Sequence, residues 1–151
     1  MAVLKETYKD INRTLEGIRT QVIDSLEWTA QNLPRFKTPE QLFTYCRQIT
    51  TYKNDPHEVE LLQTVPTLLT ENNFHGQAGA GDCDCFTILT LACCITSGWN
   101  DNYIVLVGRT KISPVHIYSA VKFNGKLYTL DLTNPYINVE RPYKYRQFLA
   151  V

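Results

Sequence analysis

The hydrophobic period of the sequence changes after Trp99, and this change constrains the fold more than any other feature. Before Trp99, apolar side chains recur at steps of three and four residues, which is typical of amphipathic helices. After it, residues 103–107 form a continuous apolar run and residues 115–123 alternate, as strands do. Helices followed by an antiparallel sheet predict an α+β fold, and 151 residues are the size of one domain.

The N-terminal segment, residues 1–34, is expected to form one long amphipathic helix over residues 3–32 that ends before Pro34. This helix either lies along the core of its own domain or docks on a partner or a second copy of the chain. Residues 35–151 are expected to complete the single domain. The apolar positions of the helix are Leu4, Tyr8, Ile11, Leu15, Ile18, Val22 and Leu26.

A second helix is predicted from Thr38, with Pro39 in the first turn and Gln41 as capping-box partner. Residues 51–80 are interpreted as irregular, with a short helical turn at residues 59–62 that Pro66 ends. A buried helix follows from Cys83, and a last edge strand is predicted over residues 143–151.

The charges balance, since Lys+Arg and Asp+Glu both number 15. A net charge of zero argues against binding to nucleic acid or a polybasic membrane anchor. The longest apolar stretch, residues 88–95, is too short to span a bilayer, and the first residues do not look like a secretory signal. We therefore expect a cytoplasmic protein whose thiols are free. Five cysteines cannot all pair within the chain, and Cys46, Cys93 and Cys94 are expected in the core.

Cys83 stands where the sequence Gly81-Asp82-Cys83-Asp84 opens a helix. Unpaired N–H groups and the helix dipole favour a thiolate there, and the same N–H groups can hold an oxyanion. Asp82 and Asp84 oppose a low thiol pKa, so they must point away or be paired if Cys83 is a nucleophile. The alternative is that both aspartates merely cap the helix.

The dipeptide Asn124-Gly125 predicts a two-residue hairpin turn, which pairs Phe123 with Lys126. In that register, His116 and Asp131 are diagonal cross-strand neighbours on one face, within side-chain reach. A carboxylate at this position fixes the imidazole tautomer. Cysteine, histidine and aspartate then have the order of nucleophile, base and orienting group, with His57 and His75 as competing bases in loops.

These motifs resemble the transglutaminase-like branch of the papain-like thiol fold, over roughly residues 39–135. The resemblance rests on the helix that begins with Gly81-Asp82-Cys83-Asp84, on His116, and on the strand segment 125–133. It implies a central cysteine-bearing helix packed on a small antiparallel sheet, with Cys83 as nucleophile, His116 as base and acid, and Asp131 as orienting group. It also implies acyl transfer from an amide through a thioester, to water or to an amine, with no cofactor.

Residues 55–66 are similar to small transglutaminase-like proteins of bacteriophages and prophages. This similarity implies a location in the host cytoplasm or in association with the virion, and the zero net charge leaves a protein or peptide amide as the expected substrate. It also leaves an alternative function, a virion structural or assembly protein that keeps the fold as a binding module. Such a protein would contact phage structural proteins or associate with itself through the N-terminal helix.

Cys85 stands where the family often has an acidic or polar residue, and it is expected either to pair with Cys83 or to compete as nucleophile. A redox function for this pair is a third alternative. Gln77, six residues before Cys83, is either an oxyanion donor or a solvated loop residue. Cys83, Cys85, Cys93 and Cys94 share one predicted helix and do not converge on a tetrahedral centre, so no metal is expected.

Overall fold

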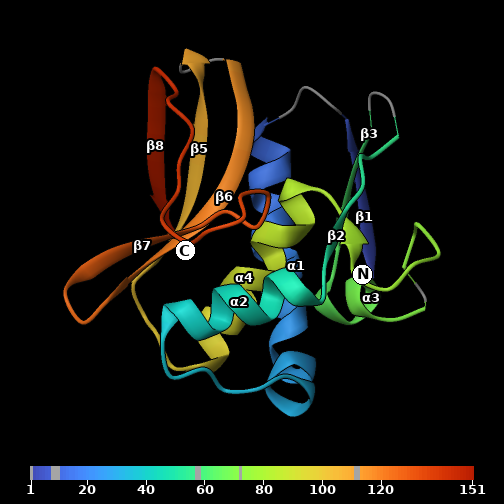
Figure 1. Cartoon of the computed structure of the whole chain (residues 1–151). Helices are drawn as coiled ribbons and strands as arrows, with labels where there is room; N and C mark the ends of the chain where they lie inside the picture. Colours follow the sequence, from blue (N-terminus) through green and yellow to red (C-terminus); the bar gives the residue numbers. More distant parts are fainter. Residues whose placement is uncertain (1, 8–10, 57–58, 72, 111–112) are drawn as a thin grey trace.

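The computed structural model describes residues 2–7, 11–56, 59–71, 73–110 and 113–151. The fold is α+β, as the sequence predicts. The central helix α4 (Cys83–Thr96) packs against α1 (Ile11–Asn32), α2 (Pro39–Gln48) and one face of the main sheet (Figure 1). No helix in the described residues is long and apolar enough to cross a membrane.

The main sheet has four antiparallel strands in the order β7-β6-β5-β8. β5 is an interior strand, as its continuous apolar run predicts, and the last strand lies at an edge. The four strands are β5 (Asn102–Thr110), β6 (Ser113–Phe123), β7 (Lys126–Leu130) and β8 (Tyr145–Ala150).

The turn between β6 and β7 has the predicted two-residue form. Asn124 and Gly125 have φ angles of 50° and 78°, the left-handed conformations that a type I′ turn requires. Phe123 consequently pairs with Lys126, and the ladder continues without a bulge. The predicted register is confirmed, so alternate residues of the two strands share a face.

The core forms around α4, which is buried on nearly all sides and ends at Ser97, with Gly98 following at a φ of 88°. Side chains along β6 alternate between two hydrophobic clusters, one on each face of the sheet. Ile117 packs in the main cluster with α4, whereas Tyr118 belongs to a smaller cluster on the opposite face of the sheet. His116 has the parity of Tyr118 and therefore lies on the face away from the main core.

The N-terminal segment differs from the predicted single helix. Val3–Thr7 forms β1, and the helix begins only at Ile11. The reason is tertiary, because β1 pairs antiparallel with β3 (Val59–Gln63), and this ladder overrides the apolar period that continues from α1. The apolar face of α1 is buried, which matches the interpretation of a helix along the core of its own domain.

The start of α2 is capped as predicted. The Thr38 hydroxyl accepts a hydrogen bond from the Gln41 N–H at 3.2 Å, and Pro39 occupies the first turn. The Gln41 side chain accepts in return from the Lys37 N–H at 3.1 Å. These bonds satisfy helix N–H groups that have no partner within the helix.

The predicted helical turn at residues 59–62 is wrong, because these residues belong to β3 and pair with β1. The helix in this region is α3 (Val65–Leu69), and Pro66 lies in its first turn, where a missing N–H costs nothing. The local sequence does not reveal β3, because its partner strand lies more than fifty residues earlier in the chain.

Two short strands fix the loop before Cys83. β2 (Thr51–Tyr52) pairs in parallel with β4 (Ala80–Gly81), directly before α4. The buried Gln63 amide donates to the Ala80 carbonyl at 3.3 Å and accepts from the Phe74 N–H at 2.9 Å. This support holds the approach to the first turn of α4.

Candidate active site

Cys83 is the first residue of α4, as the sequence predicts. Asp82 is the N-cap residue, and its carboxylate accepts a hydrogen bond from the Asp84 N–H at 3.1 Å. Cys83 is half-buried, and the Thr87 hydroxyl donates to its carbonyl at 2.7 Å. Its side chain is therefore held at the N-terminal end of α4.

The other four cysteines are fully buried, and all five are free. The core positions predicted for Cys46, Cys93 and Cys94 are confirmed. Cys85 also lies in the core, where its thiol donates to the Leu61 carbonyl at 3.1 Å. Residues two apart on a helix face different directions, so Cys85 is directed away from Cys83.

Burial raises the pKa of the Cys83 thiol well above its ordinary value, and the negative charges of Asp84 and Asp82 raise it further. A hydrogen bond from the Ile117 N–H acts in the opposite direction and lowers this pKa. Burial and the two aspartates therefore favour the thiol, and the opposition of Asp82 and Asp84 to a low thiol pKa is the one that the sequence indicates.

The carboxylates beside Cys83 do not point away from it. Asp84 is buried, and its Oδ1 lies 3.9 Å from Cys83 Sγ. Cys83 Sγ and one carboxylate oxygen from each of Asp82 and Asp84 all lie within 4.8 Å of one another. Burial, followed by repulsion from neighbouring carboxylates that include Asp55, raises the pKa of both Asp82 and Asp84. Both carboxyl groups therefore keep their protons to a higher pH than a solvated aspartate does.

His116 and Asp131 form the contact that the hairpin register predicts. His116 Nε2 lies 2.7 Å from Asp131 Oδ2. Asp131 is buried, and its Oδ1 accepts from the N–H and the hydroxyl of Thr133, at 3.1 and 2.7 Å. Asn134 donates to Oδ2 at 3.2 Å. The carboxylate is thus held from several directions.

The ionisation of Asp131 fixes the tautomer of His116. Burial by itself raises the pKa of Asp131, but the hydrogen bond and charge of His116 and the bonds from Thr133 outweigh burial and leave this pKa lowered. An ionised carboxylate only accepts hydrogen bonds, so Nε2 of His116 carries the proton. Nδ1 is then the basic nitrogen of the neutral ring.

Cys83 lies against the segment of β6 that carries His116. The Ile117 N–H, which faces Cys83 Sγ, belongs to the residue directly after His116. Ile117 lies beyond Ser119, where the pairing of β6 with β7 ends. Asp131, a loop residue directly after β7, reaches His116 there.

The remaining predicted site residues lie elsewhere. Gln77 is exposed in the loop before β4 and is not among the residues that line the main cavity. His75 lies in the same loop with its ring 5.5 Å from that of Phe74. His57 lies outside the described residues.

Tyr52 is a site residue that the sequence did not reveal. It pairs with Gly81 through β2 and β4, and its ring lies 6.2 Å from that of Phe86, one turn after Cys83. Burial, followed by the charge of Cys83, raises the pKa of Tyr52 to about 12. No signal in a single sequence marks a tyrosine in an irregular segment as part of a site.

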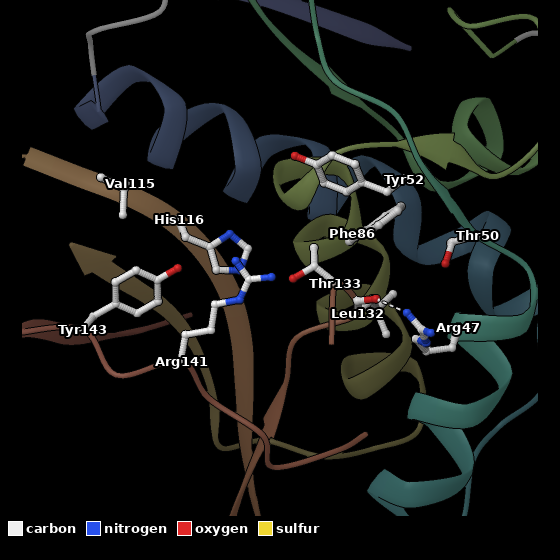
Figure 2. Close-up of a pocket in the computed structure, with 10 residues that line it drawn as sticks. All are labelled: Arg47, Thr50, Tyr52, Phe86, Val115, His116, Leu132, Thr133, Arg141 and Tyr143. Carbon is white, nitrogen blue, oxygen red and sulfur yellow. Dashed lines mark hydrogen bonds between the residues drawn. The ribbon is translucent and has the colours of Figure 1, made fainter. Parts of the chain in front are cut away.

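A cavity of about 460 Å³ lies beside Tyr52, Phe86 and His116 (Figure 2). His116 and Phe86 form part of its wall, so it adjoins both the β6 segment and the first turns of α4. The full lining is Arg47, Thr50, Tyr52, Phe86, Val115, His116, Leu132, Thr133, Arg141 and Tyr143.

A thiol at the start of a central helix, beside a strand whose histidine is paired with an aspartate, defines the papain-like class of folds. A family model described as a transglutaminase-like domain matches residues 6–148, and the chain belongs to this family. The match extends beyond residues 39–135 and includes α1. The family contains cysteine-dependent enzymes.

Solved structures give distant matches. One is a candidate cysteine protease from Cytophaga hutchinsonii, with a TM-score of 0.46 and 10% identity, covering 97% of this chain and 53% of that chain. A TGase matches with a TM-score of 0.41 and 14% identity, covering 93% of this chain and 37% of that chain. The chain thus spans about half the length of the first protein and less than half the length of the second. No curated protein matches it, and the phage similarity is not shown and stays a prediction.

Proposed function

We propose that this protein is a cysteine-dependent acyl-transfer enzyme that acts on the amide bonds of proteins or peptides. Cys83 is the proposed nucleophile, His116 the proton carrier and Asp131 the group that orients His116. The observation that carries this proposal is the 2.7 Å bond between His116 Nε2 and Asp131 Oδ2, which leaves Nδ1 as the base. Membership of the transglutaminase-like family supports the same chemistry.

In the first proposed step, Cys83 Sγ attacks the carbonyl carbon of the amide and its proton passes to His116 Nδ1. The carbon–nitrogen bond then breaks, and His116 returns the proton to the departing amine. The product on the protein is a thioester. Because Cys83 has a raised pKa and rests as a thiol, its proton leaves during the attack.

In the second step, water or an amine attacks the thioester and His116 again takes a proton. The carbon–sulfur bond breaks, and the returning proton restores the Cys83 thiol. Water yields a carboxylic acid, as in a peptidase or amidase, and an amine yields a new amide, as in crosslinking. Both outcomes use the same residues.

The oxyanion formed in each step needs hydrogen-bond donors. The unpaired N–H groups at the start of α4 are one proposed source. The Tyr52 hydroxyl is a second proposed source. Tyr52 lines the cavity, and the charge of Cys83 contributes to the raised pKa of its hydroxyl. Gln77 is not proposed for this role, because it is exposed and lies outside the lining of the cavity.

The test is to incubate the protein with a peptide mixture, with and without a primary amine, and to analyse acid-quenched samples by mass spectrometry. We expect an acyl adduct on Cys83 and new carboxyl or amide products. Cys83→Ser should abolish the products and His116→Ala should reduce them about 100-fold or more. Lys122→Ala, an exposed change on the same strand, is the matched control. Products that persist in Cys83→Ser would refute the proposal.

The alternative of a virion assembly module has no comparable support. It rests on the phage similarity, on the zero net charge and on a long N-terminal helix that docks on a partner. The apolar face of α1 instead packs against α4 within the domain. The redox alternative is also weakened, because Cys85 is buried in the core and hydrogen-bonded to Leu61.

A further inference from the structure

The cavity beside His116 has a wall with one sign of charge. Its charged side chains are Arg47 and Arg141. Among the described residues, no carboxylate belongs to the lining. Two threonines and two tyrosines add further polar groups to the surface, beside three apolar residues. A wall of this composition attracts an anion.

Arg47 is held in place by the backbone next to the catalytic aspartate candidate. It lies in the last turn of α2, and its Nη1 donates to the Leu132 carbonyl at 2.9 Å. Leu132 directly follows Asp131. A guanidinium group has five N–H donors. One of them positions Arg47, and the others are available to a ligand.

Arg141 reaches the same cavity from the segment between β7 and β8. Figure 2 shows its guanidinium beside His116 and Thr133, with Arg47 on the other side of Thr133. Within the part of the chain that the structure describes, neither Arg47 nor Arg141 forms an ion pair. Two guanidinium groups without acidic partners therefore face one polar cavity.

We propose that this cavity binds a free carboxylate of the substrate, so that the enzyme prefers amides with a carboxylate close to the bond it breaks. The inference rests on the proposed function, because it places the carboxylate next to His116. A guanidinium offers parallel N–H donors that match a carboxylate, and peptides carry this group at the C-terminus and on Glu and Asp. A volume of about 460 Å³ suits a small ligand.

The carboxylate can come from either side of the scissile amide. On the departing amine, it would be the terminal carboxylate of a peptide that loses its last residue. On the acyl side, it would be an acidic side chain. Both sources present the same chemistry to Arg47 and Arg141, so experiments have to separate them.

The first experiment compares two alkylating probes that differ in charge. Iodoacetate carries a carboxylate and iodoacetamide is its neutral analogue, and both alkylate Cys83 by displacement of iodide. We expect Arg141→Gln to lower the ratio of the iodoacetate rate to the iodoacetamide rate about threefold to tenfold, with less effect at high salt. Arg47→Lys, which keeps the charge but loses the planar donor set, should lower it less.

Lys144→Gln is the matched control, since Lys144 is an exposed cation in the same segment and outside the lining of the cavity. It should leave the ratio unchanged. An equal ratio in wild type, Arg141→Gln and Lys144→Gln would overturn the carboxylate site. Failure of the proposed function has a different signature, because iodoacetamide would then label Cys83 at the same rate in wild type and His116→Ala.

The second experiment measures how well blocked dipeptides protect Cys83 from iodoacetamide. The first pair, acetyl-Gln-Gly as the free acid and as its amide, tests a carboxylate on the departing amine. The second pair, acetyl-Glu-Gly-amide and acetyl-Gln-Gly-amide, tests a carboxylate on the acyl side. Stronger protection by the charged member of one pair, lost in Arg141→Gln, supports the site and identifies the source. Equal protection within both pairs, or stronger protection by inorganic phosphate, contradicts it.

Discussion

At the scale of single residues, the environment of Cys83 differs from the one that the helix position alone predicts. The dipole and the Ile117 N–H favour the thiolate, while burial and the neighbouring aspartates favour the thiol. Burial and the aspartates prevail and raise the pKa of the thiol, so the proposed reaction needs proton transfer to His116 rather than a resting thiolate. This balance yields two predictions.

The first prediction concerns Asp131→Asn. Without an ionised acceptor, the proton on His116 is no longer confined to Nε2, so Nδ1 loses part of its basic population. We expect the rate of Cys83 alkylation at neutral pH to fall about 100-fold, measured by mass spectrometry. Thermal unfolding serves as the control for loss of the bonds from Thr133 and Asn134. An unchanged rate in a folded variant would show that Asp131 does not orient His116.

The second prediction concerns Asp84→Asn. Removing the carboxyl group beside Cys83 takes away the largest electrostatic contribution to the raised thiol pKa. We expect the pH profile of Cys83 alkylation to move to lower pH and the rate at neutral pH to increase. Glu27→Gln, an exposed change on α1, is the control. A profile that does not move would contradict the contribution of the Asp84 charge to the pKa of the thiol.

At the scale of elements, the glycines of the loop before Cys83 differ in what they permit. Gly76 and Gly79 both have positive φ, at 68° and 84°. A Cβ on Gly79 would lie 2.0 Å from the Ile49 carbonyl oxygen, whereas a Cβ on Gly76 meets nothing within 4 Å. Close backbone contact with the end of α2 therefore demands glycine at one position only.

The third prediction uses this pair. Gly76→Ala adds only the cost of left-handed backbone, about 1–2 kcal/mol. Gly79→Ala adds a backbone clash as well, so it should destabilise by about 3 kcal/mol or more. Chemical denaturation measures both values. Equal losses of stability would contradict the close approach of Gly79 to the end of α2.

The elements differ in how far the sequence reveals them. The β6–β7 hairpin and the capped start of α2 are predictable because their signals are local, in Asn124-Gly125 and in Thr38. The length of the hairpin turn also fixes the register of its two strands. β1 and β3 escape prediction because each is defined by a distant partner, which no local period encodes.

The same distinction applies to the site. Cys83, His116 and Asp131 follow local motifs, and the hairpin register predicts the contact between His116 and Asp131. Tyr52, Arg47 and Arg141 come from three unrelated segments and meet only in the folded chain. The burial of Asp84 was also unpredictable, since a carboxylate in the first turn of a helix is usually solvated.

At the scale of the whole molecule, buried carboxyl groups with raised pKa values make stability depend on pH. The folded state holds a proton on Asp84 more tightly than the unfolded state does. This contribution is present in full below pH ~4 and is lost as pH rises toward the folded pKa. Asp131 acts in the opposite sense, because its lowered pKa adds stability above pH ~4 that is lost in acid.

The fourth prediction follows for Asp84→Asn. The difference in unfolding free energy between variant and wild type should be small near pH ~4 and should grow in favour of the variant toward pH ~8. Each unit of pKa difference between folded and unfolded states contributes about 1.4 kcal/mol. Urea denaturation at several pH values measures this difference. A constant difference across the range would contradict a raised pKa for Asp84.

The central claim is that His116, oriented by Asp131, serves the thiol of Cys83. The most direct test is the rate at which iodoacetamide labels each of the five thiols near pH ~7, in wild type and in His116→Ala, with Lys122→Ala as control. We expect Cys83 to be labelled first in wild type and in the control, and about 100-fold more slowly in His116→Ala. Equal labelling of Cys83 in all three proteins would contradict this claim.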